Sequence, residues 1–329
     1  MSIMKKCLIY YFSGTGNTSI AASMLASNLK KYGYEVTTYR YQAPNKDIPS
    51  SEGYDLVGFG YPIHAFNVPG AFAKFIKALP KLSVPTKAFF FKVSGEPYHL
   101  NDASSHHIYV KLKRKGYQFI MDKHLLMPYN IMFRYPDGVA KQMYLYLNAL
   151  TELMAKRLSL GEEDKIHYDL VLIFFSVLLR IEWIAPKLNC LFTHVDQKKC
   201  INCHLCIREC PTQSMHINKK GKIKVNSTCA MCMRCTYFCP KDAIKFGFMN
   251  NWKVNGPYQY QKLEKDDTVK EDYINRDTKD YFRHFKQYFY EQNQLLEKYH
   301  IPLPVTYSQE ETILAKEEEK ELRKTVRKA

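Results

Sequence analysis

The sequence lacks an apolar run long enough to cross a lipid bilayer. The longest, Leu170–Leu179, is bracketed by Asp169 and Arg180, and it is about half the length that a spanning helix needs. We therefore expect no transmembrane segment and interpret this run as a packed or interfacial helix. No A-x-A-like cleavage site follows the short apolar run near the N-terminus, so residues 1–12 predict a first strand rather than a signal peptide.

Several nucleotide and nucleic-acid signatures are also absent. The chain has no G-x-G-x-x-G fingerprint and no Walker A lysine, so a dedicated nicotinamide domain is not expected. Acidic residues are scarce: 32 Asp and Glu face 48 Lys and Arg, for a formal charge of +16. Because no recognised nucleic-acid motif accompanies this charge, we expect no nucleic acid and favour acidic redox proteins or anionic substrates as partners.

The positive charge is confined to the first three quarters of the chain. Residues 1–165 hold 21 basic and 12 acidic residues, and residues 166–249 hold 12 and 5. The remaining residues, 250–329, hold 15 of each and are neutral. The excess therefore lies on the two segments that carry the motifs described next.

Eight of the ten cysteines form two copies of the pattern C-x2-C-x2-C-x3-C-P. This spacing is typical of a loop that gives three thiolates to one cubane iron–sulfur cluster and the fourth to a second cluster. The pattern predicts that one cluster is held by Cys200, Cys203, Cys206 and Cys239, and the other by Cys229, Cys232, Cys235 and Cys210. The two runs resemble those of bacterial two-[4Fe–4S] ferredoxins, although His204 and Met233 stand where such ferredoxins often carry glycine.

Structural zinc and disulfides are the alternatives for these cysteines. Zinc ribbons also use C-x2-C pairs, but they have no role for a third cysteine three residues on. Three thiols in one short loop are poorly placed for disulfides. Ten cysteines for which no disulfide is expected indicate a reducing compartment, so we expect a cytoplasmic protein.

The first 161 residues alternate apolar strand-like runs with helical patterns. This alternation predicts an α/β fold, a doubly wound parallel five-stranded sheet. The expected strands are Cys7–Phe12, Glu35–Tyr41, Leu56–Tyr61, Thr86–Val93 and Gln118–Leu126. The expected helices are one that bears Ile20, Met24, Leu25 and Leu29 and ends at Gly33, then Ala71–Leu79, Ser104–Lys115 and Asp137–Leu160.

Three further segments follow this domain. Residues 162–195 are expected to form a partly helical connector, and 196–249 a small α+β cluster domain. Residues 250–329 are expected to form a helical extension. Within it, a packing helix is predicted by apolar residues at helical spacing: Ile274, Tyr281, Phe285, Tyr288, Phe289, Leu296 and Tyr299. A solvated helix is predicted over 310–328, where acids precede bases.

A phosphate site is predicted between the first strand and the first helix. The residues there are Ser13, Gly14, Thr15, Gly16, Asn17 and Thr18. Hydroxyls and unhindered glycine amides converge there on the positive end of a helix. The motif resembles the phosphate loop of flavodoxins, which holds FMN. That resemblance implies strand order 2-1-3-4-5 and a ligand beyond the carboxyl ends of the strands.

The same resemblance implies two loops that flank the flavin ring. The first would use Tyr61, Pro62, Ile63 and His64, and the second would use Ser94, Gly95 and Glu96. Neither loop contains tryptophan, and Tyr61, His64 and Tyr98 are the candidates to stack on the ring. His106 and His107 are interpreted as surface or helix-start residues.

The order of segments resembles the flavodoxin–ferredoxin fusion proteins of anaerobes, known as EFR family ferredoxins. The resemblance extends to Asn251-Trp252-Lys253-Val254-Asn255-Gly256-Pro257-Tyr258 in the last segment. It implies an iron–sulfur flavoprotein with FMN and two [4Fe–4S] clusters. Such a protein passes electrons between an external partner or a small acceptor and the flavin. An electron carrier without its own substrate, whose flavodoxin-like domain docks partners, is the alternative.

Overall fold

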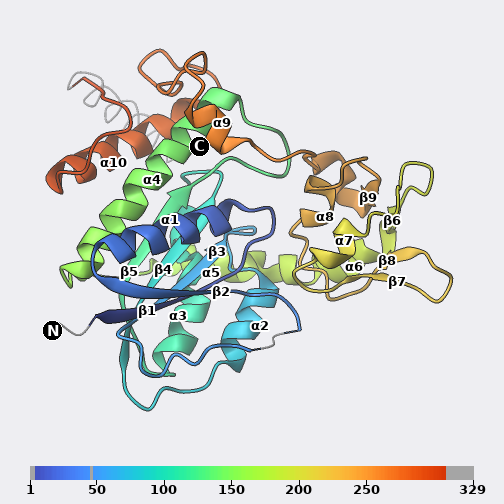
Figure 1. The fold of residues 1–329 in the computed structure, drawn as a ribbon, viewed down its shortest axis with the longest axis horizontal. Helices are drawn as coiled ribbons and strands as arrows, with labels where there is room; N and C mark the ends of the chain where they lie inside the picture. Colours follow the sequence, from blue (N-terminus) through green and yellow to red (C-terminus); the bar gives the residue numbers. More distant parts are fainter. Residues whose placement is uncertain (1–3, 45–46, 309–329) are drawn as a thin grey trace.

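The computed structural model describes residues 4–44 and 47–308, apart from the side chains of residues 181 and 182. Its first half is a single sheet between two layers of helices (Figure 1). The predicted solvated helix over 310–328 lies outside the described residues. Within the described residues, no helix combines the length and apolarity that crossing a bilayer requires.

The five-stranded sheet is parallel throughout and has the order β2-β1-β3-β4-β5. Its strands are β1 (Lys5–Tyr11), β2 (Tyr34–Arg40), β3 (Leu56–Pro62), β4 (Thr86–Ser94) and β5 (Tyr117–Leu126). The central strands are apolar on both faces because helices cover both sides. The predicted strands and the doubly wound fold are confirmed.

Two helical layers bury the two faces of the sheet. One face packs against α1 (Asn17–Lys31) and α4 (Asp137–Ser159), and the other packs against α2 (Gly70–Ala78) and α3 (His106–Lys113). The predicted third helix begins earlier than α3, as a 3₁₀ segment, η1 (His99–Ser105). This topology leaves the carboxyl ends of β1, β3 and β4 open to the loops that were predicted to bind the flavin.

The connector contains α5 (Leu170–Leu178), η2 (Leu179–Trp183) and α6 (Ala185–Phe192). Most of the long apolar run in α5 is not packed: Leu170 is 81% exposed and Phe174 is 63% exposed, while Ser176 is buried. Of the two alternatives, packed or interfacial, the packed one is wrong for these side chains, and the interfacial one stays a prediction. These exposed side chains form an apolar surface along α5.

The cluster domain is small and shaped by short elements. Strands β6 (Thr193–Val195) and β9 (Ile244–Phe246) pair antiparallel, as do β7 (Met215–Ile217) and β8 (Ile223–Val225). Single-turn helices α7 (Leu205–Arg208) and α8 (Arg234–Tyr237) each lie within one cysteine run. Because β6 pairs with β9, the last three residues of the predicted connector belong to the sheet of this domain.

The last segment returns to the first domain. It contains η3 (Gly247–Trp252), α9 (Tyr260–Glu264), η4 (Tyr281–Phe285) and α10 (Lys286–Lys298), and α10 lies beside α4 (Figure 1). Phe289 is fully buried, and its ring lies 4.6 Å from that of Tyr146. The predicted packing helix is confirmed as α10. Ile274 is buried but lies in a loop rather than in the helix, and Tyr281 is 46% exposed and lies outside the core.

Candidate cofactor sites

Each cysteine run turns sharply at the residue that precedes its short helix. His204 and Met233 are the N-terminal caps of α7 and α8, and both have left-handed backbone, with φ of 55° and 54°. Asn202 and Met231 are also left-handed, with φ of 53° and 49°. Glycine is favoured in this region because it has no Cβ. The structure therefore explains why glycine is common at the positions of His204 and Met233 in similar runs.

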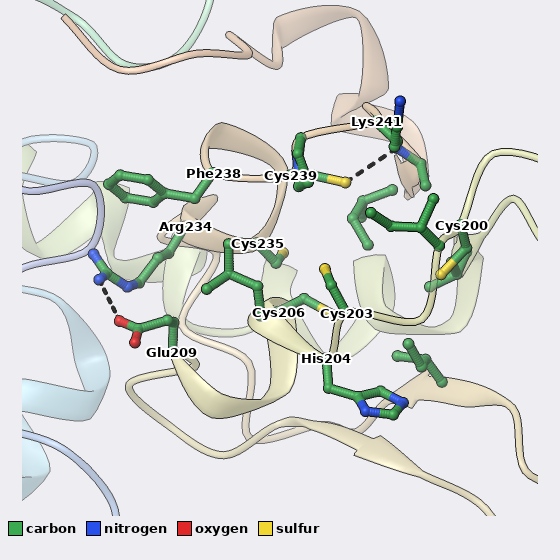
Figure 2. Close-up of a pocket in the computed structure, with 17 residues that line it drawn as sticks. Cys200, Cys203, His204, Cys206, Glu209, Arg234, Cys235, Phe238, Cys239 and Lys241 are labelled. Atoms are coloured by element: carbon green, nitrogen blue, oxygen red, sulfur yellow. Dashed lines mark hydrogen bonds and ion pairs between the residues drawn. The ribbon is translucent and has the colours of Figure 1, made fainter. Parts of the chain in front are cut away.

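The eight thiols line two neighbouring cavities. The first cavity is lined by Cys200, Cys203, Cys206 and Cys239, and Figure 2 shows their side chains around one space. The second is lined by Cys210, Cys229 and Cys232. Cys235 lies in the wall between them and lines both. Cys239 of the second run thus faces the first cavity, and Cys210 of the first run faces the second, an arrangement compatible with the cross-over pattern.

Backbone amides already point at three of the sulfurs. The N–H groups of Asn202, Met231 and Ala243 donate to the Sγ atoms of Cys200, Cys229 and Cys239, over 3.4, 3.4 and 3.3 Å. Such bonds stabilise negative charge on a thiolate and tune a bound cluster.

The thiols themselves lie in a poorly solvated environment. Burial raises the pKa of the Cys232 thiol to about 12, and burial together with Cys200 raises that of Cys206 to about 11. A closely bound cation therefore has to stabilise the thiolates, and an iron–sulfur cluster fits this donor set.

The predicted phosphate loop has unpaired backbone donors. Ser13 Oγ accepts from Ser19 N at 3.2 Å, which folds the loop over the start of α1. The N–H groups of Gly14, Thr15 and Gly16 have no acceptor within the described part of the chain. Three consecutive free amides at a helix N-terminus form a nest for an anion.

Two arginines and an amide side chain stand beside this nest. Arg40 Nη2 donates to Ser13 O at 3.3 Å, and Arg234 Nη1 donates to Gly14 O at 2.7 Å. The buried Nε atoms of both arginines and the Oδ1 atom of Asn130 lack partners among the described residues. Burial, and next the charge of Arg234, lower the pKa of Arg40. The loop and its surroundings therefore fit a phosphate dianion.

The phosphate loop touches the second cysteine run directly. A Cβ atom on Gly14 would lie 2.7 Å from Cys232 Cβ, so only glycine fits at this contact. Arg234 stands between Cys232 and Cys235 in the sequence, and its Nη2 also binds Glu209 Oε2 at 2.6 Å (Figure 2). A phosphate on this loop and a cluster in the second cavity would therefore be immediate neighbours.

Family models match the three segments that carry these features. A flavodoxin domain matches residues 8–119, and 4Fe-4S binding domains match residues 193–215 and 226–248. The chain thus joins a flavodoxin domain to two 4Fe-4S binding domains. Its cofactors are accordingly FMN and two [4Fe–4S] clusters, and its role is electron transfer.

Among solved structures, the chain is similar to flavodoxins over its first half. A flavodoxin from the domain Archaea is 13% identical, covers 46% of this chain and 98% of its own, with a TM-score of 0.32. The two-electron reduced flavodoxin of Megasphaera elsdenii is 22% identical, with the same coverage and a TM-score of 0.31. General stress protein 14 of Treponema denticola, solved in complex with FMN, is 12% identical, covers 47% and 98%, and has a TM-score of 0.34. No curated protein matches the chain.

The loop after β3 contributes less to the predicted flavin site than the sequence implies. Tyr61 is fully buried, and its hydroxyl lies 3.2 Å from Ser104 Oγ, so its ring has no free face for a flavin. Pro62, Ile63 and His64 are half-buried at the carboxyl end of the strand. Burial lowers the pKa of His64 to about 4, so its imidazole is neutral near pH 7. His64 remains a candidate to contact the ring.

The loop after β4 is held by the last segment of the chain. The Glu96 carboxylate is buried and binds Tyr135 Oη at 2.7 Å, His284 Nε2 at 2.5 Å and the Tyr281 hydroxyl. The ring of Tyr98 stacks on that of His284, with the ring centroids 5.6 Å apart.

The other residues of this loop are also occupied. Ser94 Oγ lies 2.7 Å from His124 Nε2, and the ring of Tyr129 covers Gly95. The side chains of Ser94 and Glu96 are therefore engaged by protein, and the backbone carbonyl groups of Ser94, Gly95 and Glu96 also accept hydrogen bonds from protein.

His106 and His107 lie at the start of α3, as expected. His106 is the first residue of α3, and its ring contacts that of Tyr168. The ring of the next residue, His107, lies 5.4 Å from that of Trp183.

Sequence reasoning missed Arg40, Arg234 and Asn130 as phosphate-site residues. Arg234 occupies a position that the cysteine pattern leaves unspecified, and Arg40 ends an edge strand. Asn130 Nδ2 donates to Thr15 Oγ1 at 2.5 Å, although the two residues are 115 positions apart in the sequence. No local motif marks any of them, because only the packing of distant segments brings them to the loop.

Proposed function

We propose that this protein is an iron–sulfur flavoprotein that passes electrons between two [4Fe–4S] clusters and FMN. It thereby joins the one-electron steps of an external redox partner to the two-electron chemistry of the flavin. The observation that carries the proposal is the contact between Gly14 of the phosphate loop and Cys232 of the second cysteine run.

The protein's own residues would position the cofactors. The amides of residues 14–16 and the arginines Arg40 and Arg234 would hold the FMN phosphate. The thiolates of the two cysteine runs would hold the clusters. When bound, FMN supplies exchange of one or two electrons and each cluster supplies exchange of one.

The residues between the phosphate loop and the second cysteine-lined cavity would keep the electron-transfer path short and would exclude water from it. Cys232 is partly buried against Gly14, and Met233 beside it is 1% exposed. A rigid contact between the two halves removes the need for a docking step during each internal transfer. The basic surface of both halves supports an acidic redox protein as the external partner.

Anaerobic purification and reduction by a separate ferredoxin test this proposal. We expect iron, sulfide and FMN in a ratio of about 8:8:1, and bleaching of the flavin when dithionite-reduced ferredoxin is added. A Cys232→Ser variant should slow this flavin reduction, whereas photochemical reduction of its flavin should be unaffected. Equal rates of ferredoxin-driven reduction in the parent and in Cys232→Ser would contradict the internal path.

A further inference from the structure

A cleft separate from both cysteine-lined cavities lies between the two halves of the molecule. Its volume is about 430 Å³, within the range of small-molecule sites. Its walls come from α2 and α3 of the flavodoxin domain, α6 of the connector, and the loop that begins the second cysteine run. The cleft therefore exists only because the domains are packed together.

Four lysines from three helices line this cleft. Lys74 and Lys77 lie one turn apart on α2, Lys111 lies on α3, and Lys187 lies on α6. The described lining contains no Asp or Glu. Among the described residues, none of the four lysines has a carboxylate within ion-pair distance.

The electrostatics of the cleft reflect this crowding of like charges. Burial, and next the charges of Lys77 and Arg180, lower the pKa of Lys111. Burial, followed by Arg180 and Lys111, lowers the pKa of His107 to about 4. The buried Nε2 atom of His107 has no hydrogen-bond partner among the described residues. A negative charge in the cleft would relieve this repulsion.

The other walls suit an organic anion. Trp183 presents an indole beside the lysines, and its Nε1 is fixed by Val68 O at 3.2 Å. Across the cleft, Thr212, Ser227 and Thr228 add hydroxyl groups. Hydroxyls and lysines are the common ligands of phosphate and carboxylate groups.

We propose that this cleft binds a small anion that carries two or more phosphate or carboxylate groups. Lys77 and Lys111 supply the central charge, and Lys74 and Lys187 flank them. The site is distinct from the phosphate loop, because its lining shares none of residues 13–18, although it includes His64 of the loop after β3.

The position of the cleft couples the anion to electron transfer. Cys229, a predicted ligand of the second cluster, forms part of the wall. A bound anion there disfavours the more negative, reduced cluster and lowers its reduction potential. By linkage, reduction of the cluster weakens binding of the anion by the same factor.

Calorimetry on the full-length holoprotein tests the site, with inorganic pyrophosphate and citrate as probes and potassium chloride at matched ionic strength as the blank. We expect at least one probe to bind. In Lys77→Gln/Lys111→Gln its affinity should fall by about tenfold or more, as loss of two charge-assisted contacts implies. The control is Lys219→Gln/Lys220→Gln, which removes two exposed lysines of the β7–β8 turn and should bind like the parent.

A redox titration followed by electron paramagnetic resonance gives a second readout. The probe that binds should lower the potential of one cluster in the parent and in the control, but not in Lys77→Gln/Lys111→Gln. This readout depends on the proposed cluster assignment, whereas the calorimetry does not. The proposal would be overturned if neither probe binds the parent protein. It would also be overturned if both double variants lose the same affinity for the probe.

Discussion

Arg234 reaches from the second cysteine run to the phosphate loop, where its Nη1 donates to Gly14 O at 2.7 Å. The two residues are 220 positions apart, and the same guanidinium binds Glu209 in the first run. The hydrogen bond from Arg234 lowers the pKa of the Glu209 carboxyl. One side chain therefore ties together both cysteine runs and the predicted FMN phosphate site.

Replacing Arg234 should weaken FMN binding. Arg234→Gln removes one of the two cations beside the loop, and a hydrogen bond to a charged group contributes about 1.5–3 kcal/mol. We expect the dissociation constant of FMN to rise by about tenfold or more, measured by quenching of flavin fluorescence on titration into deflavinated protein. Arg208→Gln removes an exposed arginine of the same domain and should leave the constant unchanged. Equal affinities of Arg234→Gln and the parent would remove Arg234 from the phosphate site.

Paired cysteine variants should reveal the cross-over between runs. Cys203 and Cys239 line the same cavity although they belong to different runs. Cys203→Ser/Cys239→Ser should therefore disrupt one cluster and retain about four of about eight iron atoms. Cys203→Ser/Cys210→Ser, with both changes in one run, should disrupt both clusters. Iron and sulfide quantification distinguishes these outcomes, and the reverse pattern would show that each run holds its own cluster.

Glycine at the two helix caps should have opposite effects. His204 and Met233 have nearly identical left-handed φ values, but His204 is exposed whereas Met233 is 1% exposed. His204→Gly relieves a strain of about 1 kcal/mol and should slow cluster loss in guanidinium. Met233→Gly relieves the same backbone strain, but removing its buried side chain destabilises the fold by about 2–5 kcal/mol. Its cluster should therefore be lost faster. Anaerobic bleaching of the visible absorbance measures both rates, and faster loss in His204→Gly would contradict the strain argument.

His124 should make the fold sensitive to acid. Burial, and next the charge of Lys92, lower its pKa from 6.5 to about 3 in the folded state. Between these values the unfolded chain binds a proton that the folded chain does not, so stability falls as the pH drops through this window. The loss is up to about 1.4 kcal/mol per pH unit.

The matched variants for this prediction are His124→Gln and His167→Gln. His124→Gln should flatten the dependence of the free energy of unfolding on pH between 6.5 and 4.5, measured by urea unfolding. His167 is exposed, and its replacement should leave the slope as in the parent. An unchanged slope in His124→Gln would show that another group causes the acid sensitivity.

The strands and the gathering of the cysteine-run thiols around two cavities were predictable because their signals are local. Leu56–Tyr61 is free of polar side chains apart from the tyrosine hydroxyl, and Thr86–Val93 contains the apolar run Ala88–Phe91. Such runs form strands buried on both faces. The spacing of the eight cysteines specifies one loop shape twice, and the left-handed residues at 202, 204, 231 and 233 follow from that shape. The exposure of Leu170 and Phe174 was not predictable, because an apolar run does not reveal whether a partner covers it.

The sequence by itself determined the strands, the phosphate loop and the spacing of the thiols, since each is marked by a local pattern of residues. Only the tertiary structure decided that Tyr61 is buried in the core, that Glu96 is bound by the last segment, and that Arg40, Asn130 and Arg234 surround the loop. These contacts join segments that are far apart in the chain. They are set by how the two domains and the last segment pack, and no periodicity or local motif records that packing.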